Sequence, residues 1–152
     1  MLFRSDNVFH VVFLYNTGES TVIDGVTITG GNFNSPVPLR YVQGSGICAT
    51  SDGTVASSPI LNNLIIEDNI STGGGAGFSN YSNGDACPII SNTIFRRNIS
   101  GEYGGGFAND AEKKSSPVLE NVIFSGNQAF NGGGLYCVSQ DEIGRASCRE
   151  RV

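Results

Sequence analysis

The sequence predicts an all-β protein in which short parallel strands wind into a solenoid of about four to five coils. The first observation is an internal repeat, because segments that begin at Ser58, Cys87 and Ser116 align without a gap at a period of 29 residues. The second is the pattern inside each repeat, where clusters of two or three β-branched or aromatic residues alternate with Asn, Gly or Pro. No segment carries the apolar stripe of a helix. Such a unit cannot bury its own apolar face, so successive copies are expected to stack.

Each repeat has room for three short strands, which we expect near 59–62, 64–67 and 75–79 in the first clear copy. In an upstream degenerate copy, Ile28 takes the place of Ile66, and an insertion at 33–43 delays the glycine segment. We divide the chain into clear repeats at 58–86, 87–115 and 116–141, a degenerate copy at 21–57, a β-helix repeat fragment spanning 1–141, and a tail at 142–152. The tail, "EIGRASCRERV", breaks the pattern and reads like vector-derived sequence, so we exclude it from the fold prediction.

Recurring residues predict the register of the stacked copies. Because adjacent coils lie about 4.8 Å apart, each recurring position becomes a ladder of like residues. The predicted structural ladders are Asn63, Asn92 and Asn121; Asn69, Asn98 and Asn127; Gly75, Gly104 and Gly133; Ile66, Phe95 and Phe124; and Phe78, Phe107 and Tyr136. The asparagines are expected at corners, where the residue tolerates left-handed backbone and its amide bonds the same group in the next coil.

Charged residues give an independent check of this register. Glu67 falls over Arg96, and Asp68 falls over Arg97, at the 29-residue period. Opposite charges directly across a sheet are favourable, although exposed pairs contribute little to stability. The sequence therefore predicts two ion pairs between neighbouring coils.

The composition excludes several classes of function. The chain has 152 residues, which suits one domain, and 21 of them are glycine, as expected of a turn-rich protein. The net charge of −5 and the lack of a basic run argue against nucleic-acid binding. No apolar run reaches the roughly 20 residues that span a bilayer, and the start "MLFRSDNVFHVVFLYN" has no signal-peptide pattern.

Cysteines and glycosylation motifs are interpreted through the same register. Cys48 and Cys137 fall in or beside one column but three coils, roughly 14 Å, apart, which is beyond the reach of a disulfide. With Cys87 they are expected to be isolated buried thiols, and no metal centre or cofactor is predicted because CxxC spacing and neighbouring histidines are missing. N-glycosylation patterns begin at Asn69, Asn80 and Asn98; the first and last are expected to be buried in a ladder.

No catalytic residue is predicted. The glycine run at 132–134 lacks the Lys-Ser/Thr of a phosphate loop, and His10 lies in an apolar segment typical of a packed histidine. The acidic residues considered were Asp24, Asp52, Asp68, Asp85, Asp110 and Glu112. They do not recur as a constellation of the kind a glycosidase or calcium-dependent lyase needs, so we do not expect an enzyme.

Recognition is expected where the repeats vary, in the loops and in the insertion at 33–43. Tyr41, Tyr81 and Tyr103 lie in these segments and are the predicted binding residues. The alternative is that these tyrosines merely cover the edges of coils.

The repeat also resembles a known family. "FRRN" at 95–98 and "FSGN" at 124–127, each followed by "GGGF" or "GGGL", resemble the polymorphic outer membrane protein repeat, with its F-x-x-N and G-G-A-[ILV] hallmarks. The copy at 66–69, "IEDN", departs from the first hallmark. "TVIDGVTITGGN" at 21–32 resembles the opening coil of right-handed parallel β-helix proteins of bacterial surfaces. The resemblance implies a right-handed, single-stranded parallel β-helix with the pectin-lyase-like fold.

For function, the resemblance implies a non-catalytic surface or secreted module for adhesion, binding or scaffolding, as a fragment of a longer protein. It implies an extracellular or outer-membrane location, and a surface glycan or a host or partner protein as the ligand. Open ends of a solenoid also favour edge-to-edge self-association. The alternative is a fragment of a polysaccharide lyase or glycoside hydrolase of the same fold, with its catalytic coils outside this chain.

Overall fold

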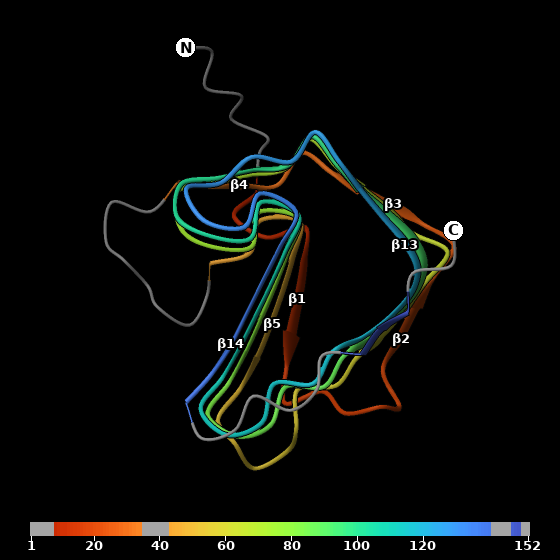
Figure 1. Ribbon diagram of the computed structural model, residues 1–152, viewed down its shortest axis with the longest axis vertical. Coiled ribbons are helices and arrows are strands. Elements are labelled where there is room, and N and C mark those ends of the chain that lie inside the picture. Colours follow the sequence, from red (N-terminus) through yellow and green to blue (C-terminus); the bar gives the residue numbers. More distant parts are fainter. Residues whose placement is uncertain (1–7, 35–42, 141–146, 150–152) are drawn as a thin grey trace.

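The computed structural model describes residues 8–34, 43–140 and 147–149, which form parallel strands and turns and no helix (Figure 1). The strands wind into a β-solenoid of about three turns with roughly 29-residue spacing. Figure 1 looks along the stack, so that β1, β5 and β14 lie in one band and β2, β3 and β13 in another. The all-β solenoid prediction is confirmed.

Three parallel sheets make up the walls of the solenoid. Sheet A contains β1 (Val12–Tyr15), β5 (Ile47–Ser51), β9 (Phe78–Ser82), β12 (Phe107–Ala111) and β14 (Leu135–Ser139), in that order. Sheet B contains β2 (Val22–Asp24), β6 (Ile60–Asn62), β10 (Ile89–Arg96), β13 (Val118–Ser125) and β15 (Ser147–Arg149), with β3 (Thr27–Thr29) and β7 (Ile65–Glu67) beside them. Sheet C contains β4 (Asn32–Phe33), β8 (Ile70–Ser71) and β11 (Ile99–Ser100).

The number of regular coils is smaller than the four to five expected. The 29-residue spacing holds where Ile60 pairs with Ile89 and Ile89 with Val118. Upstream, Val22 pairs with Ile60 and Val12 with Ile47, at longer spacings, because the insertion after β4 lengthens the first copy.

Apolar ladders fill the interior between the sheets. Ile66 is paired with Ile28 on one side and with Phe95 on the other, and Phe95 is paired with Phe124, as the sequence predicted. The Phe95 and Phe124 rings stack with centroids 5.1 Å apart. Burial of these columns, with Leu61 and Ile90 alongside, supplies the main stabilisation of a coil that has no core of its own.

The strand of sheet A begins later in each coil than predicted. In the first clear copy it is β9, which starts at Phe78 rather than at position 75. Gly75 has a φ of 61°, in the left-handed region, so the glycine segment forms a turn before the strand instead of belonging to it. The predicted strands near 59–62 and 64–67 correspond to β6 and β7.

Two ladders of the last coil are shifted by one residue from the predicted columns. Ile99 pairs with Gln128, but Tyr103 pairs with Asn131, so one residue is missing between these bridges. The left-handed glycine of this coil is consequently Gly132, with a φ of 60°, and not Gly133.

The same missing residue changes the aromatic column. Phe78 and Phe107 continue into Leu135, and Tyr136 is paired with Ala108. The ungapped alignment of Tyr136 with the two phenylalanines was therefore wrong. Since side chains alternate along a strand, the shift turns Tyr136 from the interior to the outer face of sheet A.

Asn69, Asn98 and Asn127 form a ladder of amides inside the solenoid. The Nδ2 of Asn69 donates to Oδ1 of Asn98 at 3.0 Å, and the Nδ2 of Asn98 donates to Oδ1 of Asn127 at 3.0 Å. Each of these oxygens also accepts the backbone N–H of the preceding coil's asparagine. The second amide hydrogen of Asn98 bonds the Ile66 carbonyl at 2.9 Å. The polar atoms of a fully buried side chain are thus satisfied across two coil interfaces.

Left-handed backbone occurs at one of the two predicted asparagine corners. Asn63, Asn92 and Asn121 have φ of 54°, 48° and 54°. At the second corner the left-handed residues are Asp68, Arg97 and Gly126, each one position before the buried ladder asparagine. The role of the buried asparagines at this second corner is therefore to place amide groups inside the solenoid, and not to adopt a left-handed backbone.

A second buried amide pair was not predicted. Asn80 donates from Nδ2 to Oδ1 of Asn109 at 2.8 Å and to the Ser57 carbonyl at 3.1 Å. Both asparagines are fully buried. The glycosylation pattern at Asn80 is accordingly as inaccessible as those at Asn69 and Asn98.

The predicted ion pairs join two neighbouring coils. Arg96 Nε lies 2.6 Å from Glu67 Oε2, Arg97 Nη2 lies 2.7 Å from Asp68 Oδ2, and Arg97 also reaches Glu67 at 2.6 Å. The hydrogen bond from Arg96 holds the pKa of Glu67 below its usual value, and Arg97 does the same for Asp68. The pairs confirm the predicted register.

Part of the tail, which was excluded from the fold prediction, joins the stack. The backbone of Ser147–Arg149 forms β15, which pairs with Val118–Glu120 at the repeat spacing. A parallel ladder depends on backbone hydrogen bonds, so a segment without the repeat's side-chain pattern can still extend it. The rest of the tail lies outside the described residues.

The buried amide ladder leads to the first prediction. Asn98→Ala should lower the free energy of unfolding by about 3 kcal/mol, because it strands buried donors and acceptors in both neighbouring coils. Urea unfolding followed by circular dichroism measures this change. Asn127→Ala is the matched control, and should cost only about 1 kcal/mol because water reaches this end of the ladder. Equal losses for the two variants would contradict the ladder's role.

The ion pairs lead to a second prediction. Because the folded-state pKa values of Glu67 and Asp68 are lowered, their contribution to stability is present above the unfolded-state values, about 4, and is lost as the pH falls through the folded-state values. The loss of stability in Arg97→Gln relative to the unmodified protein should therefore shrink on acidification. Thermal melts across acidic and neutral pH measure it. A difference independent of pH would rule out the charge interaction.

Candidate functional site

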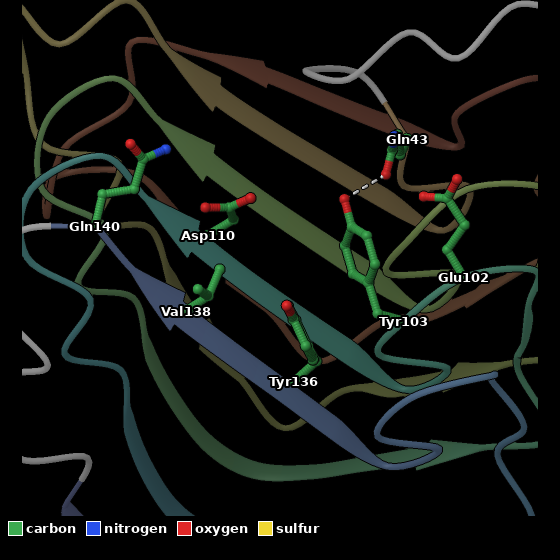
Figure 2. Close-up of a pocket in the computed structure, with 7 residues that line it drawn as sticks. All are labelled: Gln43, Glu102, Tyr103, Asp110, Tyr136, Val138 and Gln140. Atoms are coloured by element: carbon green, nitrogen blue, oxygen red, sulfur yellow. Dashed lines mark hydrogen bonds between the residues drawn. The ribbon is translucent and has the colours of Figure 1, made fainter.

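A groove of about 550 Å³ lies on the outer face of sheet A, toward the last coil (Figure 2). Its side chains come from β12, from β14 and the residue that follows it, and from the loops that precede β5 and β12. They are Gln43, Glu102, Tyr103, Asp110, Tyr136, Val138 and Gln140. The groove therefore combines two tyrosines with two carboxylates and two amides.

The alternation of side chains along β12 and β14 determines which residues form the floor of the groove. On β14, Leu135 faces the core, and Tyr136 and Val138 face outward. Asp110 of β12 is the pairing partner of Val138, so its side chain stands beside Val138 on the same outer face. The one-residue deletion in the last coil is what makes Tyr136 part of this surface.

Tyr103 is held in place by a buried glutamine. Its hydroxyl donates to Oε1 of Gln43 at 2.8 Å, and the same oxygen accepts the Gly74 N–H at 2.8 Å. Gln43 is only 5% exposed, so this bond is partly shielded from water. The Tyr103 ring lies against Gly74, where an added Cβ would come within 2.1 Å of the ring. Glycine at position 74 is thus required for the tyrosine to lie where it does.

The loops that carry these residues are also fixed. Ser71 Oγ donates to the Gln43 carbonyl at 2.6 Å, and Ser100 Oγ donates to the Tyr103 carbonyl at 2.9 Å. The rings of Tyr103 and Tyr136 contact each other with centroids 4.8 Å apart and planes inclined by 31°. A groove whose aromatic side chains are already ordered loses little conformational entropy when a ligand binds.

The chemistry of the groove suits an uncharged, hydroxyl-rich ligand. The tyrosine rings offer apolar faces, and their hydroxyls together with amide groups both donate and accept hydrogen bonds. Glu102 and Asp110 accept hydrogen bonds from hydroxyl groups and repel an anionic ligand. A pocket with apolar walls and a few placed polar groups is the usual form of a small-molecule site.

The three predicted binding tyrosines have different environments. Tyr103 lines the groove. Tyr81 is only 6% exposed, and its hydroxyl lies within hydrogen-bond distance of Asn83 Oδ1 and Glu112 Oε1. It is therefore part of the structure of its loop rather than an open contact residue. Tyr41 lies outside the described residues. Tyr136 was missed because the ungapped alignment assigned it to the core; the mismatch of "NGGGLY" with "GGGF" was the available signal.

Of the six acidic residues considered from the sequence, only Asp110 lines the groove. The others take part in local hydrogen bonds or ion pairs: Asp24 with Asn62 and Asn63, Asp52 with Thr54, Asp68 with Arg97, Asp85 with the Lys114 backbone, and Glu112 with Tyr81. The bonds from Thr54 lower the pKa of Asp52, and Asp52 in turn raises the pKa of Tyr15. Glu102, the second carboxylate of the groove, was not among the sequence candidates.

The cysteines do not share one environment. Cys48 is buried, which raises the pKa of its thiol to about 12 and makes it unreactive at neutral pH. Cys87 is half-buried and Cys137 is exposed, so the expectation of three buried thiols was wrong for these two. Within residues 8–34, 43–140 and 147–149, no three His, Cys, Asp or Glu side chains are grouped so that they could hold a metal ion.

His10 packs against the aromatic residues of the first coil. Its ring stacks on Phe33 with centroids 5.5 Å apart, and its Nδ1 donates to the Gly44 carbonyl. These contacts give it a structural role.

Comparison of the chain with protein-family models, with curated proteins and with solved structures found no match. The part of the chain that the structure describes contains no helix long and apolar enough to cross a lipid bilayer. The functional argument therefore rests on the fold and on the geometry of the groove.

Proposed function

We propose that this chain is a non-catalytic binding module of a bacterial surface or secreted β-helix protein, and that its groove on sheet A holds a neutral glycan. The observation that carries the proposal is the pair of contacting tyrosines, one of them fixed by a buried glutamine, beside two carboxylates. The apolar face of a sugar ring fits against tyrosine, and its hydroxyls fit the carboxylate and amide groups.

The repeat architecture supports an adhesive rather than a metabolic role. Each coil contacts only its neighbours, so a solenoid of this kind presents an extended surface on which side chains recur at regular spacing. The resemblance of "FRRN" and "FSGN" to the polymorphic outer membrane protein repeat favours an extracellular or outer-membrane location and a surface glycan, rather than a small metabolite, as partner.

A specific observation supports a second candidate, a polysaccharide lyase or glycoside hydrolase fragment. Glu102 and Asp110 line the same groove, and glycosidases act through two carboxyl groups that flank the bond to be cleaved. Paired carboxylates beside aromatic rings are compatible with binding alone, so we place this candidate second.

The third prediction tests glycan binding directly. The unmodified protein should retain a subset of neutral glycans on an array, and Tyr136→Ala should weaken that binding about tenfold or more, because a tyrosine that contacts the ligand contributes over 1 kcal/mol. Tyr103→Phe should weaken it less, since the ring stays and only the bond to Gln43 is lost. Titration calorimetry with the best glycan measures both changes.

Tyr15→Ala is the matched control, because Tyr15 is an exposed tyrosine on β1, at the other end of sheet A. Its binding should equal that of the unmodified protein. Equal binding by Tyr136→Ala, or retention of acidic glycans only, would contradict the proposal. Release of reducing ends or of unsaturated products, abolished by Glu102→Gln, would establish the enzyme instead.

A further inference from the structure

The two outermost strands of sheet A each have one edge without a strand partner in the part of the chain that the structure describes. β1 pairs only with β5 at one end of the sheet, and β14 pairs only with β12 at the other. Edge strands offer rows of backbone hydrogen-bonding groups to any strand of matching shape. The question is which strand fits.

The free backbone N–H and C=O groups of the two edge strands are arranged so that they can bond one another. On β1, the N–H of Val12 donates to the Gly46 carbonyl, and the N–H of Asn16 donates to the Thr50 carbonyl. Because the direction of these groups alternates along a strand, Phe13 and Tyr15 direct their N–H and C=O groups away from β5. At β14, the Gly134 carbonyl accepts the Phe107 N–H, and the Gln140 N–H donates to the Ala111 carbonyl. By the same alternation, Leu135 directs its N–H and C=O groups away from β12. If β1 of another copy lies beside β14 with Val12 opposite Leu135, the ladder continues with the same alternation.

The inward side chains match in that register. Val12 already pairs with Ile47, and this column runs through Phe78 and Phe107 to Leu135. A second copy's Val12 placed on Leu135 therefore repeats the contact that Val12 makes within its own chain. The contact in this column is therefore between two apolar side chains.

The outward side chains match as well. Phe13 and Tyr15 are 51% and 56% exposed on β1. In the same register Phe13 lies over Tyr136, and Tyr15 lies over Val138. Aromatic pairs directly across strands are among the more favourable contacts on a sheet.

Exposed aromatic residues flank both ends of the stack outside sheet A. Phe9, 56% exposed, precedes β1, and Phe130, 86% exposed, lies in the last coil between β13 and β14. Burying large apolar side chains of this kind is the main driving force for association. Each end thus presents an apolar surface around an edge strand.

We propose that copies of this chain stack end to end, with β1 of one copy added as the next parallel strand beside β14 of another. The two surfaces are different, so the contact is heterologous and leaves a free end of each kind after every addition. The product is an open-ended assembly that continues the solenoid. The contact involves Tyr136 and Val138, which also line the groove, but its test measures the mass of the assembly and needs no glycan.

A complementation experiment tests the stacking. Phe13→Asp places a charge on the β1 end, and Tyr136→Asp places one on the β14 end; an acidic residue on an edge strand prevents pairing. In sedimentation velocity over a concentration series, the unmodified protein should grow in mass as concentration rises, and each variant alone should keep the mass of one chain. An equimolar mixture of the variants should form a complex of two chains and stop there, because only one intact pair of ends remains.

Ile99→Asp is the control, since Ile99 is an exposed apolar residue on β11 that pairs with β8 on one side and bridges to Gln128 on the other. It should assemble like the unmodified protein, and circular dichroism melts should show that all three variants are folded. A single-chain mass for the unmodified protein at every concentration would overturn the proposal. So would a mixture that stays at one chain, or variants that assemble alone, because both would exclude a heterologous contact between β1 and β14.

Discussion

The structure depends on the requirement that polar groups buried between coils be satisfied at one fixed spacing. A solenoid coil has neighbours only above and below it, so every inward amide must find its partners along the stack. Asn69, Asn98 and Asn127 meet this requirement by bonding one another and the backbone between them. The apolar columns can tolerate a change of volume, but the amides tolerate no change of register, so the ladder determines how coils align.

The groove arises where this regularity is interrupted. One residue is missing between Gln128 and Asn131, after the amide ladder and before β14, so the interior stays in register while the strand that follows is displaced by one position. Leu135 then fills the core and Tyr136 faces outward toward Tyr103. The deletion changes which side chains face the surface, while the hydrogen bonds of the buried asparagines are kept. Departures from a repeat are thus better guides to function in this fold than the repeat itself.

The sequence was sufficient to predict the parts of the structure that the 29-residue period controls. It predicted the all-β solenoid, the Ile66 to Phe124 column and the ion pairs of Arg96 and Arg97, because like positions stack at constant spacing. It did not predict the shift at Tyr136, since an ungapped alignment hides a deletion inside a glycine run. It also did not predict the role of Gln43, because its hydrogen bond to Tyr103 joins residues from different coils that do not occupy equivalent positions of the repeat.

The hydrogen bonds of the amide ladder run from coil to coil, along the axis of the stack. A load applied along that axis is therefore carried by the coil interfaces in series, and at each interface by the backbone bonds of the sheets together with side-chain bonds such as those of the asparagines. The molecule resists tension only as well as its weakest interface, whereas a load across the sheets is shared by many strands at once. In mechanical terms the protein is anisotropic, and it yields by peeling away one coil at a time.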